Sequence, residues 1–174
     1  MVAATTTSGT PDRRFLLSHP AHFIALGFGS GLAPRAPGTF GTLVALALYW
    51  ALEPFVPPLW IAYLAIPLFA VGVWACGVTG RDLGVQDHGS MVWDEIVAFL
   101  PLAVMANKSF VMQLVAFALF RLFDIWKPFP IRQLDRHVKG GFGVMVDDLL
   151  AAAYAYAVIV LLVYASHKYL AAAI

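Results

Sequence analysis

The chain has a single cysteine, Cys76, and few charged residues. One cysteine excludes an internal disulfide framework and a cysteine-rich zinc site. Asp, Glu, Lys and Arg together make up 12% of the 174 residues, whereas an average soluble domain has about 25%. The net charge of +1 is too small to attract nucleic acid through bulk electrostatics. We therefore expect no nucleic-acid partner.

Apolar residues are what the chain has in excess. They make up 61% of the sequence, and the mean hydropathy is +0.80. So few charges cannot cover a soluble domain of this composition, and an apolar chain does not stay disordered. The composition therefore predicts a membrane protein. Residues 1–20 lack the apolar core of a secretory signal, so we expect a flexible cytoplasmic tail there and one membrane domain at 21–174.

Five apolar stretches predict the fold class. They lack the alternation typical of strands and are rich in Ala and Leu, so we predict an all-α, multi-helical integral membrane bundle. A membrane span needs about 20 residues, and only the second stretch is that long. The others are expected to tilt, to be extended by flanking residues or to insert in part. The stretches are residues 40–52, 59–79, 96–106, 110–123 and 149–166.

Three long polar segments separate these stretches, at 27–39, 80–95 and 124–148. If the chain crosses a membrane alternately, the three segments share one face. Nine of the 11 Lys and Arg residues then lie on that face, which the positive-inside rule assigns to the cytoplasm. Eight of the 10 acids lie in or beside the same segments. The distribution predicts one composite site at the cytoplasmic face.

The first two polar segments each allow a functional and a structural interpretation. The glycine-rich run at 27–42 with Arg35 is compatible with a phosphate cradle before a helix, and equally with a packing turn. In the second segment Asp94 and Glu95 enter an apolar helix, where unpaired acids are costly. A hard cation such as Mg²⁺ would compensate them. Helix capping is the alternative, although it explains a third acid, Asp87, poorly.

The third segment has the most charges. Arg121, Asp124 and Lys127 are spaced by three, so a helix would present them along one face. Asp147 and Asp148 are expected to open the last helix and to form a carboxylate cage with the other acids. Lys127, Arg121 and Lys139 would hold an anion against a metal. Interfacial salt bridges with snorkelling basic residues are the alternative.

Four runs in these segments closely resemble the phosphatidylglycerophosphatase A family of bacterial lipid phosphatases: GFGSGLAPRAPGTFGT, DHGSMVWDE, FRLFDIWKPFP and DRHVKGGFGVMVDD. The resemblance covers about residues 24–165, in the family's order and spacing. It implies an all-helical, Mg²⁺-dependent enzyme of the bacterial inner membrane. Its substrate in the bilayer would be phosphatidylglycerophosphate, which it would hydrolyse to phosphatidylglycerol and inorganic phosphate.

Candidate roles follow from the resemblance and from the chemistry of each side chain. Phosphate monoester hydrolysis requires charge neutralisation and positioning. His88 is a candidate acid for the departing glycerol oxygen. The other residues with an expected catalytic role are Asp94, Glu95, Asp124, Lys127, Asp147 and Asp148. Phosphate binding is expected from Arg35, Gly38, Thr39, Gly41, Lys127 and Lys139. Metal binding is expected from Asp94, Glu95, Asp124, Asp147, Asp148 and Asp87.

Two other functions are weighed against this one. A cysteine phosphatase requires C-x5-R, but only four residues separate Cys76 from Arg81. A membrane cation transporter or channel with a carboxylate-lined path is the alternative from another class. Acids at the membrane midplane would favour it, whereas here they gather at helix ends on one face.

Overall fold

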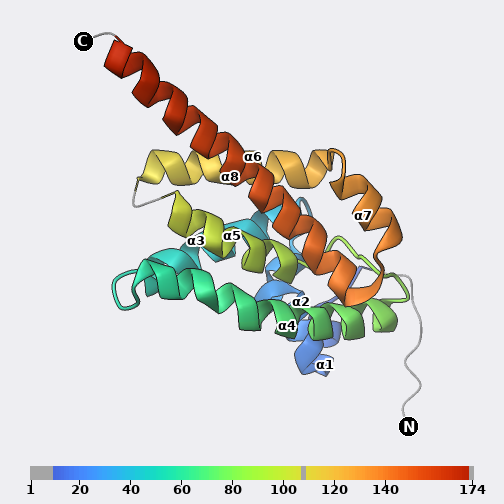
Figure 1. The fold of residues 1–174 in the computed structure, drawn as a ribbon. Helices are drawn as coiled ribbons and strands as arrows, with labels where there is room; N and C mark the ends of the chain where they lie inside the picture. The colour runs from blue at the N-terminus through green and yellow to red at the C-terminus, as the bar shows by residue number, and fades with distance from the viewer. Residues whose placement is uncertain (1–9, 107–108, 173–174) are drawn as a thin grey trace.

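The computed structural model describes residues 10–106 and 109–172. In that part of the chain every regular element is a helix, which confirms the all-α prediction. Figure 1 shows the order of the elements. They are α1 (Arg13–Ser18), α2 (Pro20–Ala25), the 3-10 helix η1 (Gly27–Leu32), α3 (Pro37–Leu52), α4 (Pro58–Leu83), α5 (Trp93–Met105), α6 (Phe110–Trp126), α7 (Ile131–His137) and α8 (Gly140–Ala172).

Local sequence explains where several helices begin and end. α3 and α4 begin with proline, whose fixed φ suits the first helical position. α4 ends at Gly84, which has a φ of 70°, the left-handed conformation that glycine adopts without steric cost. Ser109 caps α6 by accepting a hydrogen bond from the Met112 amide at 3.4 Å. The five expected apolar stretches each lie mainly within one of the helices α3, α4, α5, α6 and α8.

The central helix of the bundle is α5. Ten of its 13 residues are buried, and it packs against α3, α4, α8 and α6. Its buried face includes the acids Asp94 and Glu95 in the first turn. A helix enclosed by its neighbours holds these acids in a fixed place, because close-packed interiors leave little room for displacement.

The N-terminal segment is more ordered than the sequence predicted. Residues 1–9 of the expected flexible tail lie outside the described residues, but α1 and α2 cover most of 13–25. Leu16 of α1 is buried, and His22 of α2 pairs with Asp82 of α4 at 2.8 Å. The Ala25 carbonyl accepts a hydrogen bond from the Val92 amide at 2.8 Å. These contacts join the segment to the bundle just before Asp94.

The last helix also differs from the prediction. Asp147 and Asp148 do not open it, because α8 begins at Gly140 and places both acids about two turns inside. The sequence between 140 and 143 resembles a glycine-rich loop. In the structure a Cβ on Gly141 would collide with the Val73 carbonyl oxygen of α4. Glycine is therefore required there for close packing of two helices.

Two helices are long and apolar enough to cross a membrane: Pro58–Leu83 and Gly140–Lys168. Only 28% and 22% of their apolar windows are buried within the protein, whereas the core helix of a soluble protein is mostly buried. The sequence predicted one stretch of full length, and the structure adds the second because α8 extends on both sides of 149–166. α3, α5 and α6 have 16, 13 and 17 residues.

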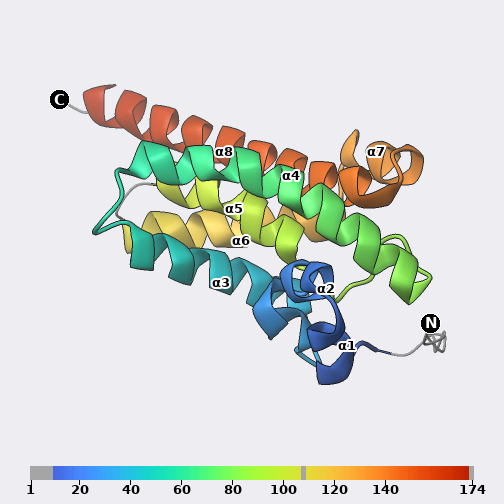
Figure 2. The same ribbon diagram turned by 90° about the horizontal axis from the view of Figure 1, so that it is seen from below.

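The three polar segments gather at one end of the bundle. Figure 2 shows α1, α2, α7 and the C-terminal end of α4 at that end, whereas the loop between α3 and α4 lies at the other end. The C-terminal end of α8 also lies at this second end. The polar residues singled out in the sequence therefore share one region of the fold.

Candidate functional site

A cavity of about 340 Å³ opens at the polar end of the bundle. We call it the site cavity. The start of α3, the loop before α5, the first turn of α5, the end of α6 and α8 all contribute to its wall. Its lining residues are Ala36, Pro37, Gly38, Asp87, Gly89, Met91, Asp94, Glu95, Arg121, Asp124, Ile125, Lys127, Asp147 and Asp148.

Three buried carboxylates in this cavity form one group, the carboxylate trio: Asp94, Glu95 and Asp148. One oxygen from each lies within 4.8 Å of the others. The residues are 7%, 8% and 3% exposed. Asp94 Oδ1, Glu95 Oε2 and Asp148 Oδ2 are buried and have no hydrogen-bond partner among the described residues.

The carboxylate trio fits a divalent cation. Buried charges without partners are strongly unfavourable, so three adjacent carboxylates require compensation. Carboxylate oxygens are the ligands that Mg²⁺ prefers. Such an ion would satisfy the three unpaired oxygens, two of which come from α5 and one from α8.

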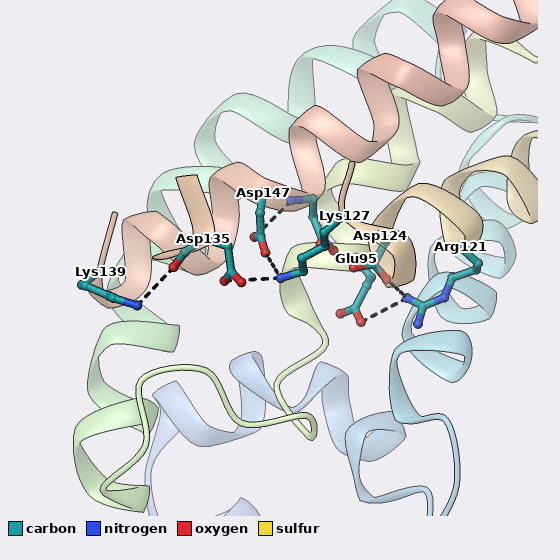
Figure 3. A network of polar contacts seen from close by, with 8 residues as sticks. Glu95, Arg121, Asp124, Lys127, Asp135, Lys139 and Asp147 are labelled. Carbon is teal, nitrogen blue, oxygen red and sulfur yellow. Dashed lines mark hydrogen bonds and ion pairs between the residues drawn. The ribbon is translucent and has the colours of Figure 1, made fainter. Parts of the chain in front are cut away.

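Arg121 of α6 compensates part of this negative charge. Its Nη1 lies 2.6 Å from Asp124 Oδ2 and 3.3 Å from Glu95 Oε1, as Figure 3 shows. Gly38 makes the arrangement possible, because a Cβ there would collide with Glu95 Oε1 and lie 2.8 Å from Arg121 Nη1. Asp124 is therefore engaged by an arginine, whereas the trio keeps oxygens without partners.

Lys127 lies in a second acidic group, the lysine cluster, with Asp87, Asp135 and Asp147. Its Nζ pairs with Asp147 and lies 3.4 Å from Asp135 Oδ1 (Figure 3). The backbone of Lys127 has a φ of 45°, a strained conformation for a residue with a side chain. Burial opposes its charged form, but the hydrogen bond and charge of Asp147, with Asp135 and Asp87, raise the pKa of Lys127 above its ordinary value.

The electrostatics of Asp87 follow from the same neighbours. Partial desolvation raises the pKa of Asp87, the positive charge of Lys127 lowers it, and repulsion from Asp135 and Asp124 raises it further. In the lysine cluster the Lys127 ammonium thus compensates the charge of the surrounding carboxylates. Lys127 is the group there that can present positive charge to an anion in the cavity.

The sequence profile of the phosphatidylglycerophosphatase A family matches residues 23–163. The chain belongs to this family. Phosphatidylglycerophosphatase A of Escherichia coli (strain K12) is 43% identical over 141 residues, 79% of this chain and 80% of the relative. Its counterpart in Haemophilus influenzae (strain ATCC 51907 / DSM 11121 / KW20 / Rd) is 45% identical over 155 residues, 88% and 94%.

A third relative carries a different description. The protein of Bacteroides thetaiotaomicron is 43% identical over 144 residues, 78% of this chain and 89% of the relative, and is provisionally described as a phosphatidylinositol-3-phosphatase. No solved structure matches the chain. Membership of the phosphatidylglycerophosphatase A family confirms the resemblance seen in the four polar runs.

The structure brings most of the expected phosphatidylglycerophosphatase site residues together. All six expected metal ligands line the site cavity, with Lys127 and Gly38. The six acids do not have equivalent surroundings, however, because Asp124 is paired with Arg121 and Asp147 with Lys127. The sequence could not separate the acids in this way, since the separation depends on which basic side chain reaches which carboxylate.

Five expected residues lie outside the lining of the site cavity. Gly41 packs against α5, where a Cβ would lie 2.7 Å from Val92 Cβ, and Thr39 is half-buried on α3. Lys139 donates to the Asp135 carbonyl at 3.2 Å. His88 Nδ1 accepts from the Ser90 amide at 3.1 Å. Arg35 is exposed beside the cavity.

The sequence analysis missed one residue of the site and gave another a different role. It predicts that Arg121 helps to hold an anion, whereas in the structure Arg121 pairs with Asp124 and Glu95; Asp135 is not singled out. Asp135 stands in the run DRHVKGGFGVMVDD, so the motif contained the signal. Its contact with Lys127 links α7 to the end of α6, and that tertiary contact has no signature in sequence spacing.

Proposed function

We propose that this chain hydrolyses the terminal phosphate monoester of phosphatidylglycerophosphate in the site cavity, releasing phosphatidylglycerol and inorganic phosphate. Family membership over residues 23–163 supports this activity. The observation that carries the proposed chemistry is the carboxylate trio with its three unsatisfied oxygens, in one cavity with Arg121 and Lys127.

Mg²⁺ is the proposed cofactor, held by Asp94, Glu95 and Asp148. When bound, it would supply positive charge against the phosphoryl oxygens. Asp124, Asp147 and Asp87 would act around it through their basic partners rather than as direct ligands. This narrows the six ligands predicted from the sequence to the three that have free buried oxygens.

The chain's own residues neutralise and orient the phosphate. Lys127 is held at the cavity wall by Asp147 and Asp135, so its ammonium is fixed where a phosphoryl oxygen can accept a hydrogen bond. Arg121 lies at the other side and keeps Glu95 and Asp124 in place. A preorganised charge arrangement of this kind lowers the barrier because it does not have to reorganise during the reaction.

The leaving glycerol oxygen requires a proton when its bond to phosphorus breaks. His88 remains the candidate donor, next to Asp87 and Gly89 in the cavity wall. In the structure His88 Nδ1 accepts the Ser90 amide hydrogen bond, which only the neutral ring can do. To act as the acid, His88 would take up a proton on Nδ1, release the Ser90 amide and give its Nε2 proton to the glycerol oxygen. The oxygen of the attacking water bonds to phosphorus, and one of the two water protons is released, which balances the proton that His88 donates.

We further propose that the site faces the cytoplasm from a multi-pass protein of the bacterial inner membrane. α4 and α8 are long enough to span the membrane. The shorter helices α3, α5 and α6 would cross it where the bilayer is locally thinned, or would insert in part. The basic residues support this orientation, since nine of 11 belong to the polar end. Gathering of the acids at that end also supports a headgroup site over a transmembrane cation path.

The test is phosphate release from defined lipids by the purified protein in detergent. We expect release from phosphatidylglycerophosphate in Mg²⁺, with a far lower kcat/KM for phosphatidic acid. Phosphatidylinositol 3-phosphate is the third substrate, because of the Bacteroides relative. Preferential turnover of that lipid would replace the proposed substrate, and no release from any of the three would contradict a lipid phosphatase.

A further inference from the structure

The site cavity has a neighbour on the same side of α3. This apolar groove has a volume of about 470 Å³, and its wall includes Arg13, Leu16, Leu17, Phe28, Leu32 and Phe40. Pro37 lines the site cavity and Phe40 lines the groove. Residues three apart on a helix are neighbours, roughly 5–6 Å apart at Cβ, so only the first turn of α3 separates the two.

The chain segment before α3 also runs between the site cavity and the apolar groove. Ala33 lines the apolar groove and Ala36 lines the site cavity, so Arg35 lies on the stretch between. Its side chain is exposed, and it makes no hydrogen bond or ion pair within the part of the chain that the structure describes. The guanidinium is therefore free to bind an anion, and the Arg35 backbone stands between a residue that lines the groove and one that lines the site cavity.

The apolar groove exposes side chains that a water-facing surface would not favour. Leu17 is 74% exposed, and Phe28 and Phe40 are 47% and 48% exposed. Phe28 also has a φ of 59°, a strained conformation for a residue with a side chain. Its ring packs edge-on against Trp93, with centroids 5.6 Å apart, and Trp93 directly precedes Asp94. The groove wall is thus built onto the first turn of α5.

The chemical groups of the proposed substrate follow the same order as the site cavity, Arg35 and the apolar groove. A terminal phosphate monoester is followed by glycerol, an internal phosphodiester and a diacylglycerol with its acyl chains. The site cavity, Arg35 and the apolar groove follow one another in that order. We propose that Arg35 binds the internal phosphodiester and that the apolar groove holds the start of one acyl chain.

This inference rests on the proposed function and gives Arg35 a different role from the one expected for it. Arg35 recognises the phosphate that is not cleaved, and it therefore selects lipids that carry two phosphate groups. Arg13, which lines the apolar groove, adds positive charge there. The complementarity of charge favours the enzyme's own anionic lipid over an uncharged lipid or a second copy of the chain.

The test compares two variants on two substrates. Long-chain phosphatidylglycerophosphate and its dibutanoyl analogue both carry the phosphodiester, but only the first fills the groove. We expect Arg35→Gln to raise KM about tenfold for both lipids, since it removes one charge-assisted hydrogen bond. Leu17→Gln should raise KM about fivefold for the long-chain lipid alone, through lost apolar contact. In both variants kcat should remain near the wild-type value, because the lost contacts stabilise the bound substrate and the transition state equally.

The controls are Arg136→Gln on α7 and Leu59→Gln at the opposite end of α4, where Leu59 is 60% exposed. Neither should change KM for either lipid. An unchanged KM in Arg35→Gln, or an equal rise for both lipids in Leu17→Gln, would overturn the proposed subsite even though the wild type is active. Failure of the wild type to release phosphate from either lipid would overturn the proposed function and this inference together.

Discussion

Replacing Asp148 by asparagine tests the carboxylate trio through two effects of opposite sign. The change keeps nearly the same volume and removes one charge from a residue that is 3% exposed. Two charged carboxylate oxygens that lie within 4.8 Å of each other repel each other by at least about 3 kcal/mol at an effective dielectric constant of 20. Without metal, Asp148→Asn should therefore be more stable than the wild type, by about 1–3 kcal/mol.

With Mg²⁺ most or all of this advantage of the variant should be lost. A cation at 100 times its Kd stabilises the wild type by about 2.7 kcal/mol, and Asp148→Asn should lose most of that gain. Loss of a ligand should also lower kcat about a hundredfold to ten-thousandfold, because 1.36 kcal/mol corresponds to a factor of ten. Asp94→Asn should behave in the same way, because it contributes another of the three unsatisfied oxygens.

The assay is thermal unfolding in detergent, with chelator and with Mg²⁺, alongside phosphate release. Roughly 2–4 °C of Tm per kcal/mol is expected for a chain of this size. Glu53→Gln, at the opposite end of the bundle, is the control and should leave phosphate release and the shift of Tm on adding Mg²⁺ unchanged. If the acids only cap helices, asparagine is an almost equal cap. Wild-type rates and an unchanged Mg²⁺ response in Asp148→Asn would then refute the metal-binding trio.

Three further predictions follow from other parts of the structure. Gly38→Ala should lower kcat/KM about a hundredfold, because its Cβ would displace Glu95 and Arg121. Gly77→Ala is the control and should stay active, since the atoms nearest to its Cβ would be 3.7 Å away. Equal activities of the two variants would contradict a positioning role for Gly38. Cys76→Ser should keep its activity and lose about 1–3 kcal/mol of stability through a buried hydroxyl, whereas an inactive folded variant would indicate thiol chemistry. Topology reporters fused after residue 56 should lie outside the cytoplasm and those near 85 and 137 inside; a reporter at 137 found outside would contradict the orientation.

The sequence predicts the elements of this fold better than their limits. The apolar stretches and the proline and glycine positions indicate five helices, and all five are present. The start of α8 is different, because Gly141 and Gly143 resemble loop residues. In the structure they are helical, and Gly141 lies where α8 packs against the backbone of α4. Only the packing partner shows which of the two roles a glycine has.

The same limit applies to the site. Charge pattern and motif resemblance bring out the acids that line the site cavity, since acids at the entrance to apolar helices are unusual. They do not show that Arg121 pairs with Asp124 or that Lys127 pairs with Asp147. These contacts join helices distant in sequence, and they decide which carboxylates remain for a cation. Nor does any spacing in the sequence predict the contact of α2 with the residue before α5.

The most direct test of the account is phosphate release from phosphatidylglycerophosphate as Mg²⁺ is added back to chelator-treated, purified protein. We predict no release in the chelator, recovery that saturates with Mg²⁺, and recovery at least about a hundredfold weaker in Asp94→Asn and Asp148→Asn. Full turnover in the presence of EDTA would contradict the central claim that the buried carboxylate trio holds a divalent cation for lipid phosphate hydrolysis.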